Sequence, residues 1–208
     1  MNWLYWCGWS LSRSLATVLL GYKASGRENV PLREAIIIAA NHQSYLDPPL
    51  VGAGIRREWH FFAKKELFDI FPLGWIISRV NAIPVRRGMY DPASLSRAFD
   101  VLAHGGGLVL FPEGTRGNGS EFLKPKPGVG MIARRARVAI VPTYAMRTNR
   151  LWAALLARKR IAIYYGRPIP VEQVEQYSDD KEGYQALAEL VMEKIAGLKA
   201  AAWAAAAG

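Results

Sequence analysis

Residues 35–50 read AIIIAANHQSYLDPPL, and this stretch decides the fold. Its first six residues are all apolar and are bounded by polar ones, a pattern that predicts a buried strand. The polar residues 41–47 then predict a loop, and Pro48 is suited to the first turn of a helix. A buried strand that leads through a polar loop into a helix is typical of the α/β class.

The same alternation of strands and helices continues along the chain. Further strands are expected at residues 82–85, 108–111, 138–144 and 161–165. Helices are expected at residues 92–104, 128–137 and 184–198, and the helical segment 64–78 is expected to break at Pro72 and Gly74. The sequence therefore predicts one α/β domain with a mixed, largely parallel central sheet flanked by helices.

Length and composition agree with one globular domain. The chain has 208 residues, of which 51% are hydrophobic and 21% are charged, so it can bury a sizeable core and is not mainly disordered. Its single cysteine, Cys7, excludes an internal disulfide framework and a multi-cysteine metal site. The three histidines leave little room for a His-rich site, so no metal ion is expected.

The charge of the chain is strongly positive and unevenly distributed. The formal net charge is +10, although residues 171–194 hold seven acidic residues and only two lysines. Basic clusters occur at Arg56-Arg57, Lys64-Lys65, Arg86-Arg87, Arg134-Arg135-Arg137 and Arg158-Lys159-Arg160. This balance predicts an anionic partner, either nucleic acid, anionic lipid or a phosphorylated substrate. Because no cluster forms a long basic tail, a structured surface is favoured over a disordered nucleic-acid-binding arm.

The N-terminal residues 2–22 are rich in tryptophan and leucine and predict an amphipathic helix. At a spacing of three or four residues, one stripe of this helix consists of Leu4, Cys7, Leu11, Leu15, Val18 and Tyr22. Aromatic residues near its start suit a lipid headgroup region, whereas Arg13 makes the segment marginal as a bilayer-spanning helix. We therefore expect a membrane-associated helix. The alternative is an amphipathic helix packed on the core of its own domain.

The loop 41–47 carries a histidine and an acid directly after a buried strand, where open α/β sheets tend to place ligand sites. On one continuous helix His42 and Asp47 would lie on different faces, but a bend between strand and helix can bring them together. Asp47 would then accept the Nδ1 proton of His42 and leave Nε2 able to take a proton from a hydroxyl. The alternative is that Asp47 only caps the helix starting at Pro48 and that His42 is structural.

A second loop, FPEGTR at residues 111–116, follows another buried strand. Gly114 permits a tight turn or the close approach of a ligand. Arg116 offers a planar donor fork suited to phosphate. Glu113 is expected to orient Arg116 or to accept a hydrogen bond from a substrate hydroxyl. The alternative is a Glu–Arg pair in an ordinary turn.

Together the two loops closely resemble the glycerolipid acyltransferase family, the 1-acylglycerol-3-phosphate acyltransferases of phospholipid synthesis. The first family signature is a histidine, four residues and an aspartate (HX4D), usually written NHxSxxD, and it stands here as NHQSYLD. Another signature, FPEGTR, is present without change. A third, roughly GxIFIxR, is matched loosely by NAIPVRR at 81–87, with Arg87 at the arginine position and Arg86 beside it. Residues 138–142 match the family's aliphatic strand ending in proline, and the resemblance covers about residues 36–145.

The resemblance implies an activity and a role for each site residue. The activity is transfer of a fatty acyl group from acyl-CoA or acyl carrier protein to the free hydroxyl of lysophosphatidic acid, which makes phosphatidic acid. His42 is then the catalytic general base, and Asp47 orients it. The substrate-binding residues are Arg87, Glu113, Gly114, Thr115, Arg116 and Lys126, with Lys124 as a further phosphate candidate. No cofactor is implied, because the thioester is a co-substrate that is already activated.

The composition of the flanking segments predicts an arrangement, and the resemblance implies a location. Residues 1–24 are expected to form the N-terminal membrane-anchoring segment and residues 25–199 the acyltransferase domain. Residues 200–208 form a low-complexity tail that is expected to be disordered or an added remnant. The expected partners are membrane lipids, an anionic bilayer surface, lysophosphatidic acid and the acyl thioester carrier, with no nucleic acid. The expected location is the cytoplasmic face of the bacterial inner membrane.

Alternatives stay open at two levels. Within the family, the acceptor could be a lysophospholipid with a larger head group, lyso-ornithine lipid or glycerol-3-phosphate. From a different class, a basic nucleic-acid-binding module would explain the net charge but not the two loops. A serine hydrolase is disfavoured because the chain has no G-x-S-x-G elbow.

Overall fold

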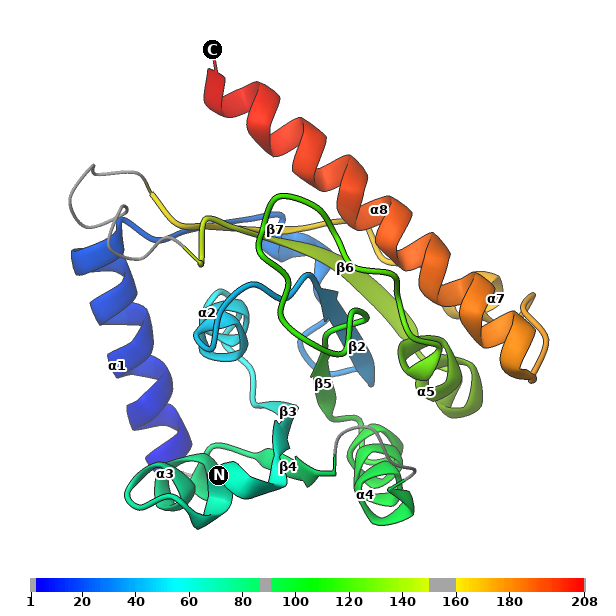
Figure 1. Cartoon of the computed structure of the whole chain (residues 1–208), viewed down its shortest axis with the longest axis horizontal. Coiled ribbons are helices and arrows are strands. Elements are labelled where there is room, and N and C mark those ends of the chain that lie inside the picture. The colour runs from blue at the N-terminus through cyan, green and yellow to red at the C-terminus, as the bar shows by residue number, and fades with distance from the viewer. Residues whose placement is uncertain (1–2, 87–90, 150–159, 208) are drawn as a thin grey trace.

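A seven-stranded sheet lies at the centre of the computed structural model, which describes residues 3–86, 91–149 and 160–207 (Figure 1). The strands are β1 (Lys23–Ser25), β2 (Ile36–Ala40), β3 (Trp59–Lys64), β4 (Ala82–Val85), β5 (Gly107–Leu110), β6 (Ala139–Met146) and β7 (Ala162–Tyr165). Their order is β1-β7-β6-β2-β5-β3-β4, and neighbours are parallel except for the antiparallel pair β6 and β7. The predicted mixed, largely parallel sheet is thus confirmed.

Helices cover both faces of this sheet (Figure 1). They are α1 (Trp3–Leu20), α2 (Asp47–Ala53), α3 (Leu73–Arg79), α4 (Pro92–Ala103), α5 (Gly128–Ala136), α7 (Val171–Val174) and α8 (Lys181–Ala207), with 3-10 helices η1 (Arg27–Asn29) and η2 (Lys65–Asp69). Residues of α1 and α2 join one hydrophobic core, and residues of α4, α5 and α8 join the other. The domain therefore has three layers, with the sheet in the middle.

Strand β2 shows why the run AIIIAA has no polar alternation. Ile36 and Ile38 contribute to the core under α1 and α2, whereas Ile37 and Ala39 contribute to the core under α4, α5 and α8. All five residues of β2 are buried. A strand covered on both faces needs apolar side chains at every position, as the sequence pattern indicates.

The structure contains two strands that the sequence pattern does not predict. Strand β1 has only three residues and lies at one edge of the sheet, where Lys23 and Ser25 are exposed. Strand β3 mixes aromatic residues with His60, so it shows neither a pure apolar run nor a strict alternation. The segment 64–78 breaks as expected, because η2 ends at Asp69 and α3 begins at Leu73.

The expectation that the C-terminal tail is disordered is wrong. Helix α8 continues through the alanine-rich stretch as far as Ala207. Ala202 is buried, and the indole Nε1 of Trp203 donates a hydrogen bond to Tyr144 Oη at 3.1 Å. Lys199 Nζ donates to the carbonyl of Ser120 at 2.7 Å. Alanine has the highest helix propensity and its small side chain allows close packing, so this composition extends the helix.

Helix α1 turns its apolar stripe away from the domain. Leu11, Leu15 and Val18 are 60%, 49% and 81% exposed. The buried residues of α1 are Tyr5 and Ala16, which do not belong to that stripe. The alternative, a helix packed on the core of its own domain, holds for another face of α1, because Tyr5 and Ala16 are buried and Ala16 joins the core that includes α2. Of the stripe itself, Leu11, Leu15 and Val18 are exposed, whereas Tyr22, just beyond α1, is buried. None of the helices in the described part of the chain is long and apolar enough to cross a membrane.

Candidate active site

The order of the strands brings the two loops together. Strand β2 pairs in parallel with β5 on one side and with β6 on the other, so their carboxyl ends share one edge of the sheet. Asn41, directly after β2, is buried, and its side-chain amide bonds the backbone of β6. Its Nδ2 donates to Ala145 O at 3.1 Å, and its Oδ1 accepts from Ala145 N at 2.7 Å. This contact ties the end of β2 to β6, and the parallel pairing of β2 with β5 places the loops after those two strands side by side.

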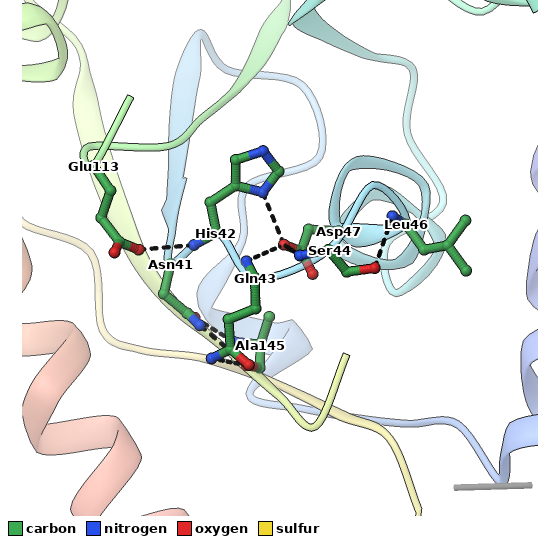
Figure 2. Close-up of polar contacts among 8 residues, drawn as sticks. All are labelled: Asn41, His42, Gln43, Ser44, Leu46, Asp47, Glu113 and Ala145. Atoms are coloured by element: carbon green, nitrogen blue, oxygen red, sulfur yellow. Dashed lines mark hydrogen bonds and ion pairs between the residues drawn. The ribbon is translucent and has the colours of Figure 1, made fainter. Parts of the chain in front are cut away.

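His42 and Asp47 form a buried pair in this edge. His42 Nδ1 lies 2.8 Å from Asp47 Oδ2, and the two residues are 6% and 0% exposed. The same carboxylate oxygen accepts hydrogen bonds from the backbone N–H groups of Gln43 and Ser44 at 2.6 and 2.7 Å. The chain bends between strand and helix as predicted, so the carboxylate faces the preceding loop instead of capping α2. Figure 2 shows the other ring nitrogen of His42 directed away from Asp47.

This geometry fixes the chemical state that His42 offers. A carboxylate can only accept hydrogen bonds, so Nδ1 carries the proton and Nε2 of the neutral ring is an acceptor. The ring is also stacked on Phe111, with centroids 4.1 Å apart and planes inclined by 21°. Both contacts restrain the imidazole. The pair is therefore suited to removing a proton from a group bound near Nε2.

Glu113 holds the histidine loop from the other side. Its Oε1 accepts the backbone N–H of His42 at 2.8 Å, and its Oε2 accepts the backbone N–H of Leu123 at 2.8 Å (Figure 2 shows the first). Glu113 is 2% exposed. The sequence predicts that this carboxylate orients Arg116 or accepts from a substrate hydroxyl, whereas in the structure it accepts hydrogen bonds from the backbone N–H groups of His42 and Leu123. A buried carboxylate with two backbone donors is well satisfied as an ion.

Arg116 pairs with an aromatic residue of the first loop. Its guanidinium carbon lies 3.5 Å from the centre of the Tyr45 ring, and its Nη2 donates to Tyr45 Oη at 2.8 Å. Both side chains are exposed. Sequence reasoning does not identify Tyr45, although an aromatic residue inside the histidine loop is the available signal. Stacking restrains the guanidinium at the mouth of the site while leaving donors for an anion.

Gly114 and Lys126 lie against each other. Gly114 has a φ of +67°, and a Cβ placed on it would lie 2.8 Å from Lys126 Cδ. The backbone N–H of Lys126 donates to Pro112 O at 2.8 Å, which returns the chain to the FPEGTR loop. The positive φ of this turn favours the glycine, and the flexible lysine stem crosses it closely. Thr115 and Lys124 are exposed, and Arg87 lies outside the described residues.

A pocket of about 280 Å³ opens beside His42. Polar lining comes from His42, Lys126, Asp91 and Ser94. Most of the wall is apolar and comes from Phe62, Val85, Leu95, Val109, Phe111, Val129 and Ile132, among others. Because these residues come from three strands and two helices that are distant in sequence, no local pattern predicts the pocket. A largely apolar cavity that begins at a histidine can hold a hydrocarbon chain next to reacting atoms.

The basic residues of the chain differ in whether an acidic residue lies beside them in the structure. Arg135 Nε lies 3.3 Å from Asp179 Oδ1, and Arg137 forms an ion pair with Glu175. The acidic segment 171–194 thus lies over the basic residues at the end of α5 and offsets part of their charge. The exposed bases Arg116, Lys124 and Lys126 instead belong to the loops at the site.

Comparisons with known proteins agree with this geometry. A 1-acyl-sn-glycerol-3-phosphate acyltransferase of Bacillus subtilis is 28% identical over 180 residues, which cover 86% of this chain and 88% of that protein. A lyso-ornithine lipid O-acyltransferase of Pseudomonas aeruginosa is 32% identical over 136 residues, 64% of this chain and 50% of that protein. The crystal structure of the 1-acyl-sn-glycerophosphate acyltransferase PlsC from Thermotoga maritima superposes with a TM-score of 0.72 at 26% identity. That superposition covers 94% of this chain and 80% of the other.

The family assignment rests on the match to a family model. The model for acyltransferases matches residues 22–146, which span more than half of the chain and include both site loops. The fold, the similar sequences and the family model all point to acyltransferases. This protein therefore belongs to the acyltransferase family of enzymes.

Proposed function

We propose that the protein transfers a fatty acyl group from an acyl thioester to the free hydroxyl of lysophosphatidic acid, which makes phosphatidic acid. The observation that carries this proposal is the buried His42–Asp47 pair at the opening of an apolar pocket. The relatives named as 1-acyl-sn-glycerol-3-phosphate acyltransferases support this acceptor. The donor is proposed as acyl-CoA or acyl carrier protein because the site offers a base for direct transfer.

The reaction follows from the proton state of His42. Nε2 removes the proton of the acceptor hydroxyl while the alkoxide oxygen forms a bond to the thioester carbonyl carbon. Asp47 stabilises the imidazolium that results. When the tetrahedral intermediate collapses, the carbon–sulfur bond breaks and the imidazolium returns its proton to the leaving thiolate. The products are the new ester, a free thiol and neutral His42, so no covalent acyl-enzyme is needed.

The two substrates are assigned to different parts of the site. The fatty acyl chain lies in the apolar pocket, whose lining excludes water from the thioester carbonyl. The acceptor phosphate lies at the polar mouth, where Arg116 and Lys126 present positive charge, and Arg87 joins them by its place in the sequence. Glu113 contributes by holding the backbone of His42. No cofactor is required in this scheme.

We also propose that the enzyme works at an anionic membrane surface. The apolar stripe of α1 is exposed, and Phe71 and Trp75 near α3 are 86% and 51% exposed. Figure 1 shows α3 beside the N-terminal end of α1, and a Cβ on Gly8 would lie 3.6 Å from Val80 Cγ1. Lysophosphatidic acid resides in the bilayer, so exposed apolar groups near basic ones favour docking. The cytoplasmic face of the inner membrane is the proposed location.

A second acceptor is favoured by one observation, the similarity to a lyso-ornithine lipid O-acyltransferase. An ornithine head group carries a carboxylate where lysophosphatidic acid carries a phosphate. Arg116 can bind either anion, because its fork matches carboxylate and phosphate alike. The two acceptors therefore need to be compared directly.

The test is an acyl-transfer assay with purified protein in mixed micelles. Lysophosphatidic acid and lyso-ornithine lipid are offered in turn with acyl-CoA or acyl carrier protein thioester. We expect transfer to lysophosphatidic acid, and we expect His42→Ala to lower it by about 10²–10⁴-fold. His104→Ala is the control, because His104 is exposed and lies at the end of α4. Unchanged transfer by His42→Ala, or none by the unaltered protein with any lyso-lipid, would refute the proposal.

A further inference from the structure

Side chains from other elements supply donors to several carbonyl groups at the C-terminal end of α2, where Gly52 O also accepts the backbone N–H groups of Gly54 and Ile55. The last carbonyl groups of a helix have no partner within the helix and need donors from elsewhere. Tyr22 Oη donates to Leu50 O at 2.8 Å, and Tyr165 Oη donates to Val51 O at 2.5 Å. Burial raises the pKa of both phenols well above the usual value, so they remain protonated donors. These two residues hold the inner side of α2 against the sheet.

The remaining carbonyl groups of this end are held by α1. Trp9 Nε1 lies 3.2 Å from both Gly52 O and Ile55 O, and Arg13 Nη1 donates to Ala53 O at 2.8 Å. The guanidinium of Arg13 also lies 5.4 Å from the centre of the Trp9 ring. Trp9 and Arg13 are four residues apart and share one face of the helix. This face differs from the exposed apolar stripe, so Arg13 interrupts the apolar pattern because it has a partner in the domain.

The other end of α2 carries Asp47. The helix has seven residues, so about 10 Å of rigid backbone separates its capped end from the residue that contacts His42. Gln43 and Ser44 fix the carboxylate of Asp47 through one oxygen atom only. The place of Asp47 along the helix axis therefore depends on how firmly the far end of α2 is held.

We propose that Arg13 and Trp9 are positioning residues for catalysis, which act through α2 to keep Asp47 in contact with the imidazole of His42. This inference rests on the proposed catalytic roles of His42 and Asp47. It assigns α1 a task in the chemical step, in addition to contact with lipid. A displacement of about 1 Å in a catalytic group can lower a rate by about 10²-fold, so modest movements of α2 are sufficient.

The test compares variants that remove single donors. Arg13→Met and Trp9→Phe each lose the hydrogen bond to α2, because neither new side chain has a donor, whereas Arg13→Lys keeps a donor at that place. We expect kcat to fall by about 10- to 100-fold in the first two, with KM for both substrates unchanged, and to recover in Arg13→Lys. Ser14→Ala, an exposed residue beside Arg13, is the matched control. Binding to anionic vesicles should stay the same in all four variants.

A spectroscopic signature separates positioning from a loss of folding. The chain has three histidines, so ring nitrogen resonances of protein labelled with 15N-histidine can be assigned to His42. In the folded variants Arg13→Met and Trp9→Phe, we expect the protonated Nδ1 signal of His42 to weaken or shift, while His60 and His104 stay unchanged. Normal kcat with an unchanged His42 signal would overturn this inference. Full activity of His42→Ala would instead overturn the proposed function.

Discussion

The backbone N–H of His42 donates to Glu113 Oε1 at 2.8 Å, although the two residues are 71 positions apart in the chain. The second oxygen of Glu113 holds Leu123 in the same way. One buried carboxylate thus joins the loop that carries His42 to the segment that runs from the FPEGTR loop to Leu123. Glu113 of the FPEGTR segment thereby holds the backbone of His42 and Leu123 in place.

The Glu113→Gln variant tests this support. A glutamine has one acceptor oxygen, so one of the two backbone N–H groups would face an amide NH₂ and lose its partner. We expect a loss of about 1–3 kcal/mol in the free energy of unfolding and a fall of about tenfold or more in kcat. Urea unfolding and acyl-transfer kinetics measure the two effects. Glu121→Gln, an exposed neighbour, should leave both unchanged, and equal values for the two variants would contradict the role of Glu113.

The Arg116→Lys variant tests whether the positive charge alone or the planar guanidinium group is needed at the site. Lysine keeps the positive charge but loses both the stacking on Tyr45 and the bidentate fork. We expect KM for lysophosphatidic acid to rise by about tenfold, with kcat little changed, because the residue binds the acceptor without touching the reacting oxygen. Steady-state kinetics at varied acceptor concentration measure this split. Arg97→Lys on the exposed side of α4 is the control, and a KM like that of the unaltered enzyme would argue against phosphate binding by Arg116.

Leu95→Phe reduces the volume of the apolar pocket. Leu95 belongs to α4 and lines the cavity that begins at His42. We expect kcat/KM for long-chain acyl-CoA to fall by about tenfold or more, while short-chain donors are used as before, because only long chains reach this wall. A series of acyl-CoA donors of increasing length measures the preference. Ser96→Ala, which changes an exposed position of the same helix, should keep the original preference, and an identical preference in Leu95→Phe would place the acyl chain elsewhere.

The double variant Leu11→Asp and Leu15→Asp tests membrane docking. Both leucines are exposed in the protein alone, so the change should leave folding intact while placing charges where lipid contact is proposed. We expect binding to anionic vesicles to weaken on the order of 100-fold, as the loss of two buried leucine side chains predicts. Vesicle sedimentation measures the binding, and circular dichroism checks the fold. Ser10→Asp adds a charge to the same helix outside the stripe; release to the same extent by both would mean that charge alone is responsible.

The sequence predicts the parts of this protein that depend on local pattern. The apolar run at β2 identifies a strand covered on both faces, and Asp91 caps α4 by accepting the N–H of Ser94 as its position before Pro92 indicates. The contact of His42 with Asp47 is also predictable, since the bend after a strand limits where the two side chains can lie. In contrast, strand β1 has no apolar pattern because it has only three residues, and two of them, Lys23 and Ser25, are polar and exposed.

Contacts between distant segments are beyond the reach of local pattern. Tyr45 is restrained by Arg116, 71 positions away, and the apolar pocket assembles only when α4 and α5 pack on the sheet. The alanine-rich end of the chain looks featureless in composition, yet Ala202 is buried and Trp203 is hydrogen-bonded. This segment is ordered because it packs against residues that are distant in sequence, such as Tyr144, and a local sequence pattern does not identify such partners.

The contact of Lys199 with Ser120 has a consequence for the order in which the enzyme matures. Chains are synthesised from the N-terminus, so His42 and the FPEGTR loop leave the ribosome well before α8 exists. Until α8 docks, strand β6 lacks its cover and the loop after FPEGTR lacks its outer attachment. A nascent chain therefore carries His42, Asp47 and the FPEGTR loop before α8 is present, and the segment after that loop gains its contact with Lys199 only when this helix has been made.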